Sequence, residues 1–215
     1  MPAQLRILIT AGPTYEPIDE VRFIGNRSSG RLGVAVASEA LRRGWIVTLL
    51  LGPNAADPEP GVHVRRFRTT ADLEGLLREE FPKCDVLVMA AAVADYRPVG
   101  GGAGGKIRRS EGGLRIELEP TPDLLAGVAK SRQPGQVIVG FALEPRERLM
   151  ESAREKILRK GIDAIVANPL ETMDSPEIEA VLIRRDGTSE ATPGRVDKGV
   201  FAAWLIDRLV RAGSK

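Results

Sequence analysis

The sequence predicts an α/β fold, a doubly wound and mostly parallel Rossmann-like sheet with helices on both faces. Short apolar runs rich in Val, Ile and Leu alternate with stretches of helical periodicity, which is typical of βαβ units. The run at 46–51 is apolar throughout, as expected of a strand buried on both faces. The 215 residues are 43% hydrophobic and 4% aromatic. This length and composition suit a single domain, residues 1–215, with a largely aliphatic core.

The first βα unit comprises a strand at 5–9 and a helix at 34–43 that ends at Gly44. The loop between them, at 11–29, is much longer than the roughly 2–6 residues usual for such a connection. Long loops at this position are often functional. We therefore expect a binding site in this loop.

The start of this helix is a candidate anion site. Ser28 or Ser29 can cap the helix, and Gly30 and Gly33 allow close approach of the backbone. Backbone N–H groups and the positive end of the helix dipole would then face a ligand. An ordinary capped helix with a packing glycine would have the same sequence, so both interpretations stay open.

The later segments continue the alternation. Strands are expected at 46–51, 62–67, 85–92, 136–141 and 163–168, and helices at about 70–80, 121–131 and 145–160. Thr121 would cap the second of these helices, with Pro122 at its first position. Small residues at 91–98 leave room for a ligand beyond the carboxyl end of a strand. Since ligands bind at such ends in doubly wound sheets, this segment and residues 10–33 are expected to line one cleft.

Residues 97–119 interrupt the pattern. The run at 100–105 consists almost entirely of glycine, residues 106–109 are basic, and 114–118 alternates like a half-exposed strand. We expect a flexible flap on a hairpin that carries Lys106 over the cleft. A solvated surface excursion is the alternative interpretation.

The C-terminal part predicts a hairpin and a closing helix. Asp186-Gly187 between 180–184 and 189–192 is a strong hairpin signal. Residues 198–212 are amphipathic at helical spacing. In the preceding helix, Lys156 and Lys160 lie four residues apart and share one face, which is either solvated or part of a site.

Few residues here suit covalent or acid–base catalysis. The chain has one histidine, His63, and one cysteine, Cys84, which excludes a Ser-His-Asp triad, a Cys-His pair and a zinc cluster. Chemistry must then depend on Lys, Arg, Asp, Asn, backbone amides and a hard metal such as magnesium.

Charge and hydropathy bear on the binding partners and the compartment of the protein. A formal charge of +2 is too small to indicate a nucleic-acid partner. We expect no internal disulfide, no secretory signal and no membrane span, and therefore a cytoplasmic protein.

Two nucleotide motifs are incomplete. Gly25 and Gly30 have the spacing of a phosphate-binding loop, but Arg31-Leu32 replace the Lys-Ser/Thr that reach phosphate and magnesium. The second strand ends in Leu51-Gly52 without the acid that holds a dinucleotide ribose, which argues against an NAD(P)-dependent oxidoreductase.

Seven segments, in order along the chain, resemble the phosphopantothenoylcysteine synthetase (phosphopantothenate–cysteine ligase) family of coenzyme A biosynthesis. They are residues 9–16 (ITAGPTYE), 17–33 (PIDEVRFIGNRSSGRLG), 90–98 (AAAVADYRP), 106–109 (KIRR), 121–124 (TPDL), 139–144 (VGFALE) and 153–168 (AREKILRKGIDAIVAN). The departures are local: 100–105 is more glycine-rich than is usual in this family, and 169–179 lacks its common features. In many bacteria this domain is fused behind a flavin-dependent decarboxylase.

The resemblance implies a two-step ligase. The carboxylate of 4′-phosphopantothenate attacks a nucleoside triphosphate, CTP or ATP with Mg2+, to give an acyl-nucleotide and pyrophosphate. The amine of L-cysteine then displaces the nucleoside monophosphate. Both steps require an anionic centre to be positioned and neutralised, which lysines, amides and magnesium do without a histidine base. A non-catalytic nucleotide-binding module and an NAD(P)-binding oxidoreductase remain the alternatives.

Matching positions imply the site residues. Asn26 would be catalytic, its amide donating to the carboxyl oxygen of the acyl-nucleotide, and Lys106 would close over the phosphates. The implied nucleotide contacts are Met89, Asp95, Lys106, Thr121, Pro122, Phe141, Lys156 and Lys160. The expected substrate contacts are Asn26, Ser28, Ser29, Gly30, Ala91 and Ala92, of which the two serines and Gly30 rest on the helix geometry alone. No metal ligand is assigned. The family is typically dimeric, and the hairpin around Asp186-Gly187 is our hypothesis for the surface that pairs.

Overall fold

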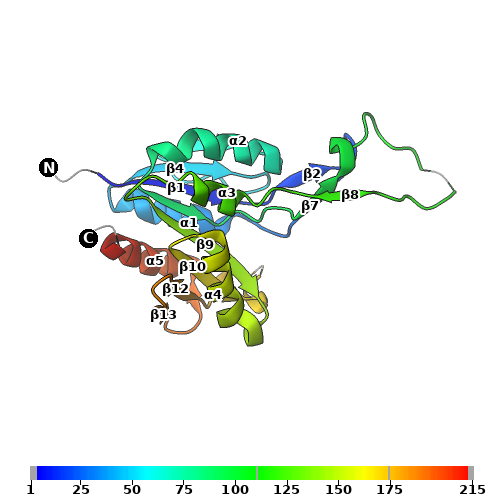
Figure 1. Cartoon of the computed structure of the whole chain (residues 1–215). Coiled ribbons are helices and arrows are strands. Elements are labelled where there is room, and N and C mark those ends of the chain that lie inside the picture. Colours follow the sequence, from blue (N-terminus) through cyan, green and yellow to red (C-terminus); the bar gives the residue numbers. More distant parts are fainter. Residues whose placement is uncertain (1–3, 110, 174, 213–215) are drawn as a thin grey trace.

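An eight-stranded sheet forms the centre of the fold. The computed structural model describes residues 4–109, 111–173 and 175–212. In spatial order the strands are β13 (Ser189–Ala191), β12 (Val181–Arg184), β10 (Ala164–Pro169), β9 (Val137–Glu144), β6 (Val86–Met89), β1 (Arg6–Ala11), β4 (Ile46–Leu51) and β5 (His63–Arg66). The six strands from β10 to β5 are parallel, whereas β12 and β13 are antiparallel (Figure 1). The predicted Rossmann-like class is confirmed.

The order of the strands reverses beside β1. From β1 the chain adds β4 and β5 on one side, then returns to add β6, β9 and β10 on the other. In such sheets ligands bind beyond the carboxyl ends of the strands at the point of reversal, which here lies between β1 and β6. Pro13 and Ala92, which follow these two strands, form a parallel bridge. The expectation that residues 10–33 and 91–98 lie at one edge is therefore confirmed.

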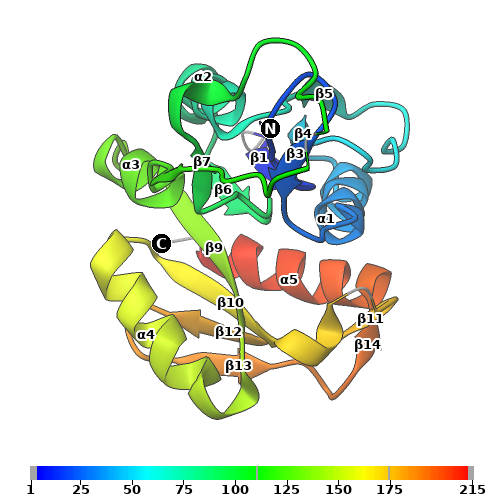
Figure 2. The same ribbon diagram turned by 90° about the vertical axis from the view of Figure 1, so that its right-hand side faces the viewer.

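Helices cover both faces of this sheet. Two of them, α1 (Arg31–Arg42) and α5 (Lys198–Ala212), pack side by side on one face (Figure 2). The other three, α2 (Thr70–Glu80), α3 (Leu124–Lys130) and α4 (Leu149–Lys160), cover the opposite face. Successive residues of β1 supply the two cores, Ile9 on the α1 face and Leu8 on the α2 face. This alternation follows from the two-residue period of a strand. None of the described helices is long and apolar enough to span a membrane.

The starts of α1, α3 and α4 differ from those predicted, whereas α2 and α5 begin as expected. In α2, Thr69 caps the helix, accepting from Asp72 N at 3.1 Å while Asp72 accepts from Thr69 N at 2.9 Å. Helix α1 begins at Arg31 with Gly30 as its N-cap at φ 68°, so neither predicted serine cap forms. In α3 the cap is Asp123, which accepts from Ala126 N at 3.1 Å.

An arm extends from the carboxyl edge of the sheet, and we define it as residues 15–25 and 96–120 without the undescribed residue 110. It contains two antiparallel pairs, β2 (Tyr15–Pro17) with β3 (Phe23–Gly25) and β7 (Tyr96–Pro98) with β8 (Leu118–Pro120). In Figure 1 the flap forms the long excursion on the right, and both ends of the described chain lie on the opposite side. The strand expected at 114–118 forms only at its last residue. Residues 114–117 are exposed and therefore lack the buried face that such alternation requires.

The C-terminal predictions are confirmed. Strands β12 and β13 flank the Asp186-Gly187 turn, in which Gly187 has φ 88°. Helix α5 spans the predicted 198–212. A further small pair, β11 (Glu177–Ile178) with β14 (Val196–Asp197), joins the segments on either side of this hairpin.

Close packing of α1 on β1 depends on Gly33. A Cβ at this position would lie 2.5 Å from Ala11 Cβ and 3.2 Å from Thr10 O. We predict that Gly33→Ala lowers the free energy of unfolding by about 1–3 kcal/mol because the helix must move away from the sheet. The control is Gly127→Ala in α3, where a Cβ meets nothing within 4 Å and should stabilise by about 0.5–1 kcal/mol. Urea unfolding measures both, and equal effects of the two substitutions would contradict the packing argument.

Candidate functional site

A cavity of about 950 Å3 opens beyond the carboxyl ends of β1, β6, β9 and β10. Its lining comes mainly from residues 25–33, 89–95 and 121–125, together with side chains of α4 and of the segment after β10. Small-molecule sites have volumes of about 300–1,000 Å3, so the cavity has room for a nucleotide and a second substrate.

The start of α1 forms one wall of the cavity. No side chain caps this helix, and its first intrahelical bond is Val34 N to Gly30 O at 3.1 Å. The N–H groups of Arg31, Leu32 and Gly33 therefore precede the helical ladder. Gly30 is required here because of its positive φ and because a Cβ would lie 2.7 Å from Ala55 Cβ. This helix end, with Arg27 and Arg31 in the lining, suits an anion.

The floor of the cavity is the segment 91–94, which follows β6. Ala91 N donates to Thr10 Oγ1 at 3.0 Å, and Ala94 N donates to Thr14 Oγ1 at 2.9 Å. These hydroxyls continue the pairing of β1 with β6 after the strand itself ends at Met89. The predicted strand end at 92 is therefore three residues too long, because threonine hydroxyls accept from two of the amides there, although Ala92 N still donates to Gly12 O at 2.9 Å.

Asn26 lies against this floor. Its Nδ2 donates to Val93 O at 2.9 Å, and an amide nitrogen carries a second N–H. On the opposite side of the segment, Thr121 Oγ1 donates to Ala94 O at 2.5 Å. Thr121 does not cap α3 as predicted, because that helix begins at Leu124 with Asp123 as its cap.

Helix α4 supplies a basic wall. Lys156, Arg159 and Lys160 line the cavity, and each lysine already has a carboxylate partner: Lys156 binds Glu144, and Lys160 Nζ lies 3.1 Å from Asp123 Oδ1. An arriving phosphate would therefore compete with protein carboxylates for these two lysines.

Both partner carboxylates are ionised at neutral pH. Burial by itself raises the pKa of Glu144, but the hydrogen bonds from Lys156 and Ser152 outweigh burial, and the pKa lies below its ordinary value. Burial also raises the pKa of Asp123, but the hydrogen bond from Ala126 N–H and the charge of Lys160 outweigh burial. The pKa of Asp123 therefore also lies below its ordinary value. Each of the two α4 lysines therefore has a carboxylate of lowered pKa as its partner.

The structure brings together all the predicted site residues except one. Those that line the cavity are Asn26, Ser28, Ser29, Gly30, Met89, Ala91, Ala92, Asp95, Thr121, Pro122, Phe141, Lys156 and Lys160. Lys106 does not line it and is exposed on the arm. The expectation that the flap carries Lys106 over the cleft is wrong for this conformation.

Contacts with the 15–25 hairpin hold this part of the flap away from the cleft. Ala103 N donates to Ile18 O at 2.9 Å, and Ile107 N donates to Asp19 Oδ2 at 3.2 Å. Arg22 Nη2 donates to Ile107 O at 3.2 Å. Residues on both sides of Lys106 are therefore bound to the hairpin.

The sequence analysis missed the lining from the far side of the sheet. Asn168, Thr172, Met173, Ile178 and Lys198 also line the cavity. Asn168 is the second-to-last residue of the parallel strand β10, so the rule applied to 91–98 would have found it. Lys198 starts α5, and no local pattern connects that position with the carboxyl ends of distant strands.

Cysteine, histidine and acidic clusters contribute nothing to this cavity. Cys84 is buried, and burial raises the pKa of its thiol to about 12. His63 is exposed on β5. Within residues 4–109, 111–173 and 175–212, no group of three or more His, Cys, Asp or Glu side chains could hold a metal ion.

The chain is similar to characterised proteins over nearly its whole length. A family model described as DNA/pantothenate metabolism flavoprotein C-terminal domain matches residues 3–212. The coenzyme A biosynthesis bifunctional protein CoaBC of Mycobacterium bovis is 42% identical over 218 residues, covering 95% of this chain and 52% of that protein. The protein of the same name from Thermococcus kodakarensis is 42% identical over 209 residues, covering 95% and 50%. The chain thus spans about half the length of these curated relatives.

Solved structures have the same fold. A crystal structure of the C-terminal domain of the coenzyme A biosynthesis bifunctional protein CoaBC has a TM-score of 0.81 and 33% identity, covering 95% of this chain and 93% of that one. The DNA/pantothenate metabolism flavoprotein from Streptococcus pneumoniae has a TM-score of 0.85 and 25% identity, covering 97% and 99%.

Asp19 binds the flap through Ile107 N, so the docking of the flap should depend on the charge of this carboxylate. Burial raises its pKa, but the backbone N–H groups of Val21, Arg22 and Ile107 outweigh burial, so the pKa lies below the ordinary value of 3.8. Because the pKa of Asp19 is lowered in the folded protein, its carboxylate stabilises the docked flap fully when the pH is above the ordinary pKa. This stabilisation is lost as the pH falls through the pKa of the folded protein. We predict that docking of 103–107 stays constant from pH 7 to pH 5 and loosens only below about pH 4.

Amide hydrogen exchange of residues 103–109 tests this prediction. Asp19→Asn should accelerate the exchange at neutral pH, whereas Glu20→Gln, which changes an exposed neighbour, should not. Equal exchange in the wild type and Asp19→Asn would show that the carboxylate does not hold the flap.

Proposed function

The chain belongs to the DNA/pantothenate metabolism flavoprotein C-terminal domain family, and we propose that it joins 4′-phosphopantothenate to L-cysteine through an acyl-nucleotide. The observation that carries the proposal is one cavity that combines the uncapped start of α1, the basic wall of α4 and the Asn26 amide. The relatives' name, coenzyme A biosynthesis bifunctional protein, supports the same pathway.

The nucleoside triphosphate, CTP or ATP, would bind with its phosphates between the start of α1 and the lysines of α4. Backbone N–H groups and two ammonium groups suit a polyanion. Mg2+ bound with the nucleotide would take phosphate oxygens and waters as ligands and neutralise phosphate charge. Asp95, which is exposed and lines the cavity, would contact the nucleotide from the floor.

The first step is a displacement at the α-phosphorus. A carboxylate oxygen of 4′-phosphopantothenate forms a bond to that phosphorus, and the bond to pyrophosphate breaks. Asn26 would donate an N–H to the other carboxyl oxygen, which orients the nucleophile without adding negative charge. Lys156 and Lys160 would offset the charge that moves onto the leaving pyrophosphate.

The second step forms the amide. The neutral amine of cysteine attacks the acyl carbon, the C–O bond to the nucleotide breaks, and the amine loses a proton as the nucleoside monophosphate leaves. The Asn26 amide would stabilise the oxygen that becomes negative in this step. Lys106 would act after the flap leaves the 15–25 hairpin and covers the cavity.

The reaction itself is the first test. The protein, Mg2+, 4′-phosphopantothenate and cysteine are incubated with CTP or ATP, and pyrophosphate and the mass of the organic product are followed together. We predict phosphopantothenoylcysteine from the wild type, and a rate about 100-fold or more lower from Asn26→Asp because its carboxylate repels the substrate. Nucleotide binding without turnover would instead establish a non-catalytic binding module, and saturable NAD(P)H binding would favour an oxidoreductase.

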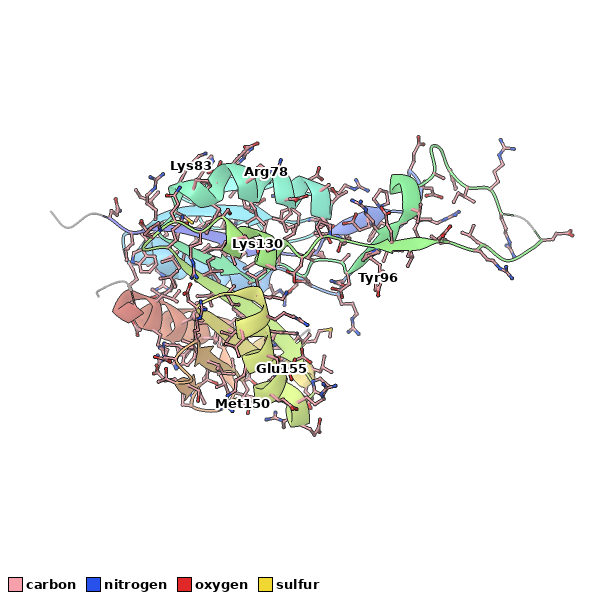
Figure 3. All side chains as sticks on the ribbon, viewed as in Figure 1. Arg78, Lys83, Tyr96, Lys130, Met150 and Glu155 are labelled. Carbon is pink, nitrogen blue, oxygen red and sulfur yellow. The ribbon has the colours of Figure 1, made fainter. Side chains whose placement is uncertain are left out.

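The two cavity lysines should act through nucleotide affinity. We predict that Lys156→Ala and Lys160→Ala each weaken nucleotide binding about 10- to 100-fold, the value of a lost charged hydrogen bond. Lys130→Ala on α3 is the matched control, because Lys130 is exposed and does not line the cavity (Figure 3). Isothermal titration calorimetry measures all three, and unchanged affinity in both cavity variants would exclude this phosphate site.

We also propose that the chain forms a homodimer. Exposed apolar side chains gather on the arm, including Val21 (59% exposed), Tyr96 (55%) and Leu118 (43%), and Tyr96 lies at the base of the arm in Figure 3. The arm is therefore a stronger candidate for the pairing surface than the Asp186-Gly187 hairpin. Sedimentation velocity should show a dimer that Tyr96→Asp weakens, whereas weakening by Gly187→Asn instead would favour the hairpin.

A further inference from the structure

We propose that Glu16 is a positioning residue that fixes the cavity floor and Asn26 relative to each other through the buried hydroxyls of Thr70 and Thr14. The effect on catalysis rests on the proposed function, whereas the effect on the floor does not. Glu16 itself does not line the cavity.

Glu16 is a buried carboxylate with two strong donors. The residue is 3% exposed, and its Oε1 accepts from Thr70 N and from Thr70 Oγ1, both at 2.7 Å. Thr70 is the first residue of α2, so the carboxylate also lies at the positive end of that helix. An acceptor so placed binds both the first backbone N–H of the helix and the Thr70 hydroxyl, and it thereby orders that hydroxyl.

Thr14 connects the oriented Thr70 hydroxyl to the cavity floor. Both threonines are fully buried, and their hydroxyl oxygens lie 3.4 Å apart. The single Thr70 hydroxyl proton faces Glu16 Oε1 at 2.7 Å and Thr14 Oγ1 at 3.4 Å, so the acceptor strength of Glu16 sets how that hydroxyl is oriented toward Thr14. A lone pair of Thr14 Oγ1 then faces Ala94 N, which donates to it at 2.9 Å.

A second route runs from Glu16 through the backbone. Glu16 on β2 is paired with Ile24 on β3, two residues before Asn26. The same carboxylate therefore anchors the hairpin that leads into Asn26. The two routes meet where Asn26 Nδ2 donates to Val93 O, next to the Ala94 amide that Thr14 holds.

Glu16→Gln isolates the charge at nearly constant shape. The amide oxygen can still accept from Thr70 N and Thr70 Oγ1, but a neutral amide is a weaker acceptor than a carboxylate. The Thr70 and Thr14 hydroxyls should therefore be held less firmly. Thr14→Val removes the last hydroxyl of the chain, and Thr14→Ser retains it. Glu20→Gln, an exposed carboxylate on the same hairpin, is the matched control.

The first readout needs no activity. Hydrogen exchange of the Ala91 and Ala94 amides, followed by NMR on proteins shown to be folded by circular dichroism, reports the floor directly. We expect Ala94 to exchange roughly 5- to 10-fold faster in Glu16→Gln and Thr14→Val. Ala91, which Thr10 holds, should change less, and Thr14→Ser and Glu20→Gln should match the wild type. Unchanged exchange at Ala94 in Glu16→Gln or Thr14→Val would overturn the proposal whatever reaction the protein catalyses.

The second readout separates positioning from plain stability. In the ligase assay Glu16→Gln and Thr14→Val should lower kcat about 10-fold or more through misplacement of reacting groups, while the nucleotide KM changes less than about 3-fold because α1 and α4 are untouched. Thr14→Ser should restore most of kcat. In an Asn26→Ala background the Glu16→Gln effect on kcat should disappear, since both act through the same amide. Unchanged kcat per folded molecule, a change confined to KM, or full additivity with Asn26→Ala would overturn the positioning role.

Discussion

The site depends on how the ends of β1 and β6 stay joined after the strands stop. Backbone bonds continue there, from Ala92 N to Gly12 O and from Thr14 N to Ala92 O. The Thr10 and Thr14 hydroxyls add to them by accepting from Ala91 N and Ala94 N. The cavity floor is thus an extension of the sheet in which backbone and side-chain acceptors share the amides.

The cavity is electrostatically prepared for an anion without being a bare cationic surface. Lys156 and Lys160 are each paired with a carboxylate, Glu144 and Asp123, which limits mutual repulsion before ligand binds. The start of α1 adds the partial positive charge of the helix dipole, which is fixed in the backbone and carried by no side chain. Net charge of the chain, +2, conceals this arrangement because opposite charges elsewhere on the surface offset it.

Much of the candidate site could be predicted because its residues occupy ends of regular elements. Local patterns identify the helix start at Ser28 to Gly30 and the strand end at 91–98, whereas the family resemblance implied Asn26 and the binding role of Lys156. The predicted caps were wrong because two helices begin elsewhere: α3 starts at Leu124 with Asp123 as its cap, and α1 starts after Gly30, which adopts a positive φ against Gly12 and Ala55. The prediction for Lys106 was wrong because the backbone N–H of Ile107, the residue after it, donates to Asp19. Asp19 lies 87 positions before Lys106 in the sequence, so no local pattern indicates this contact.

The sequence by itself determined the fold class, the C-terminal hairpin, the closing helix and the chemical character of the site, because period, turn residues and residue inventory are local properties. Only the tertiary structure decided which hydroxyl holds the floor, where the flap rests and that Asn168 and Lys198 complete the lining. These features are contacts between segments far apart in the chain. Their free energies depend on which donors and acceptors burial leaves available, and no local pattern records that.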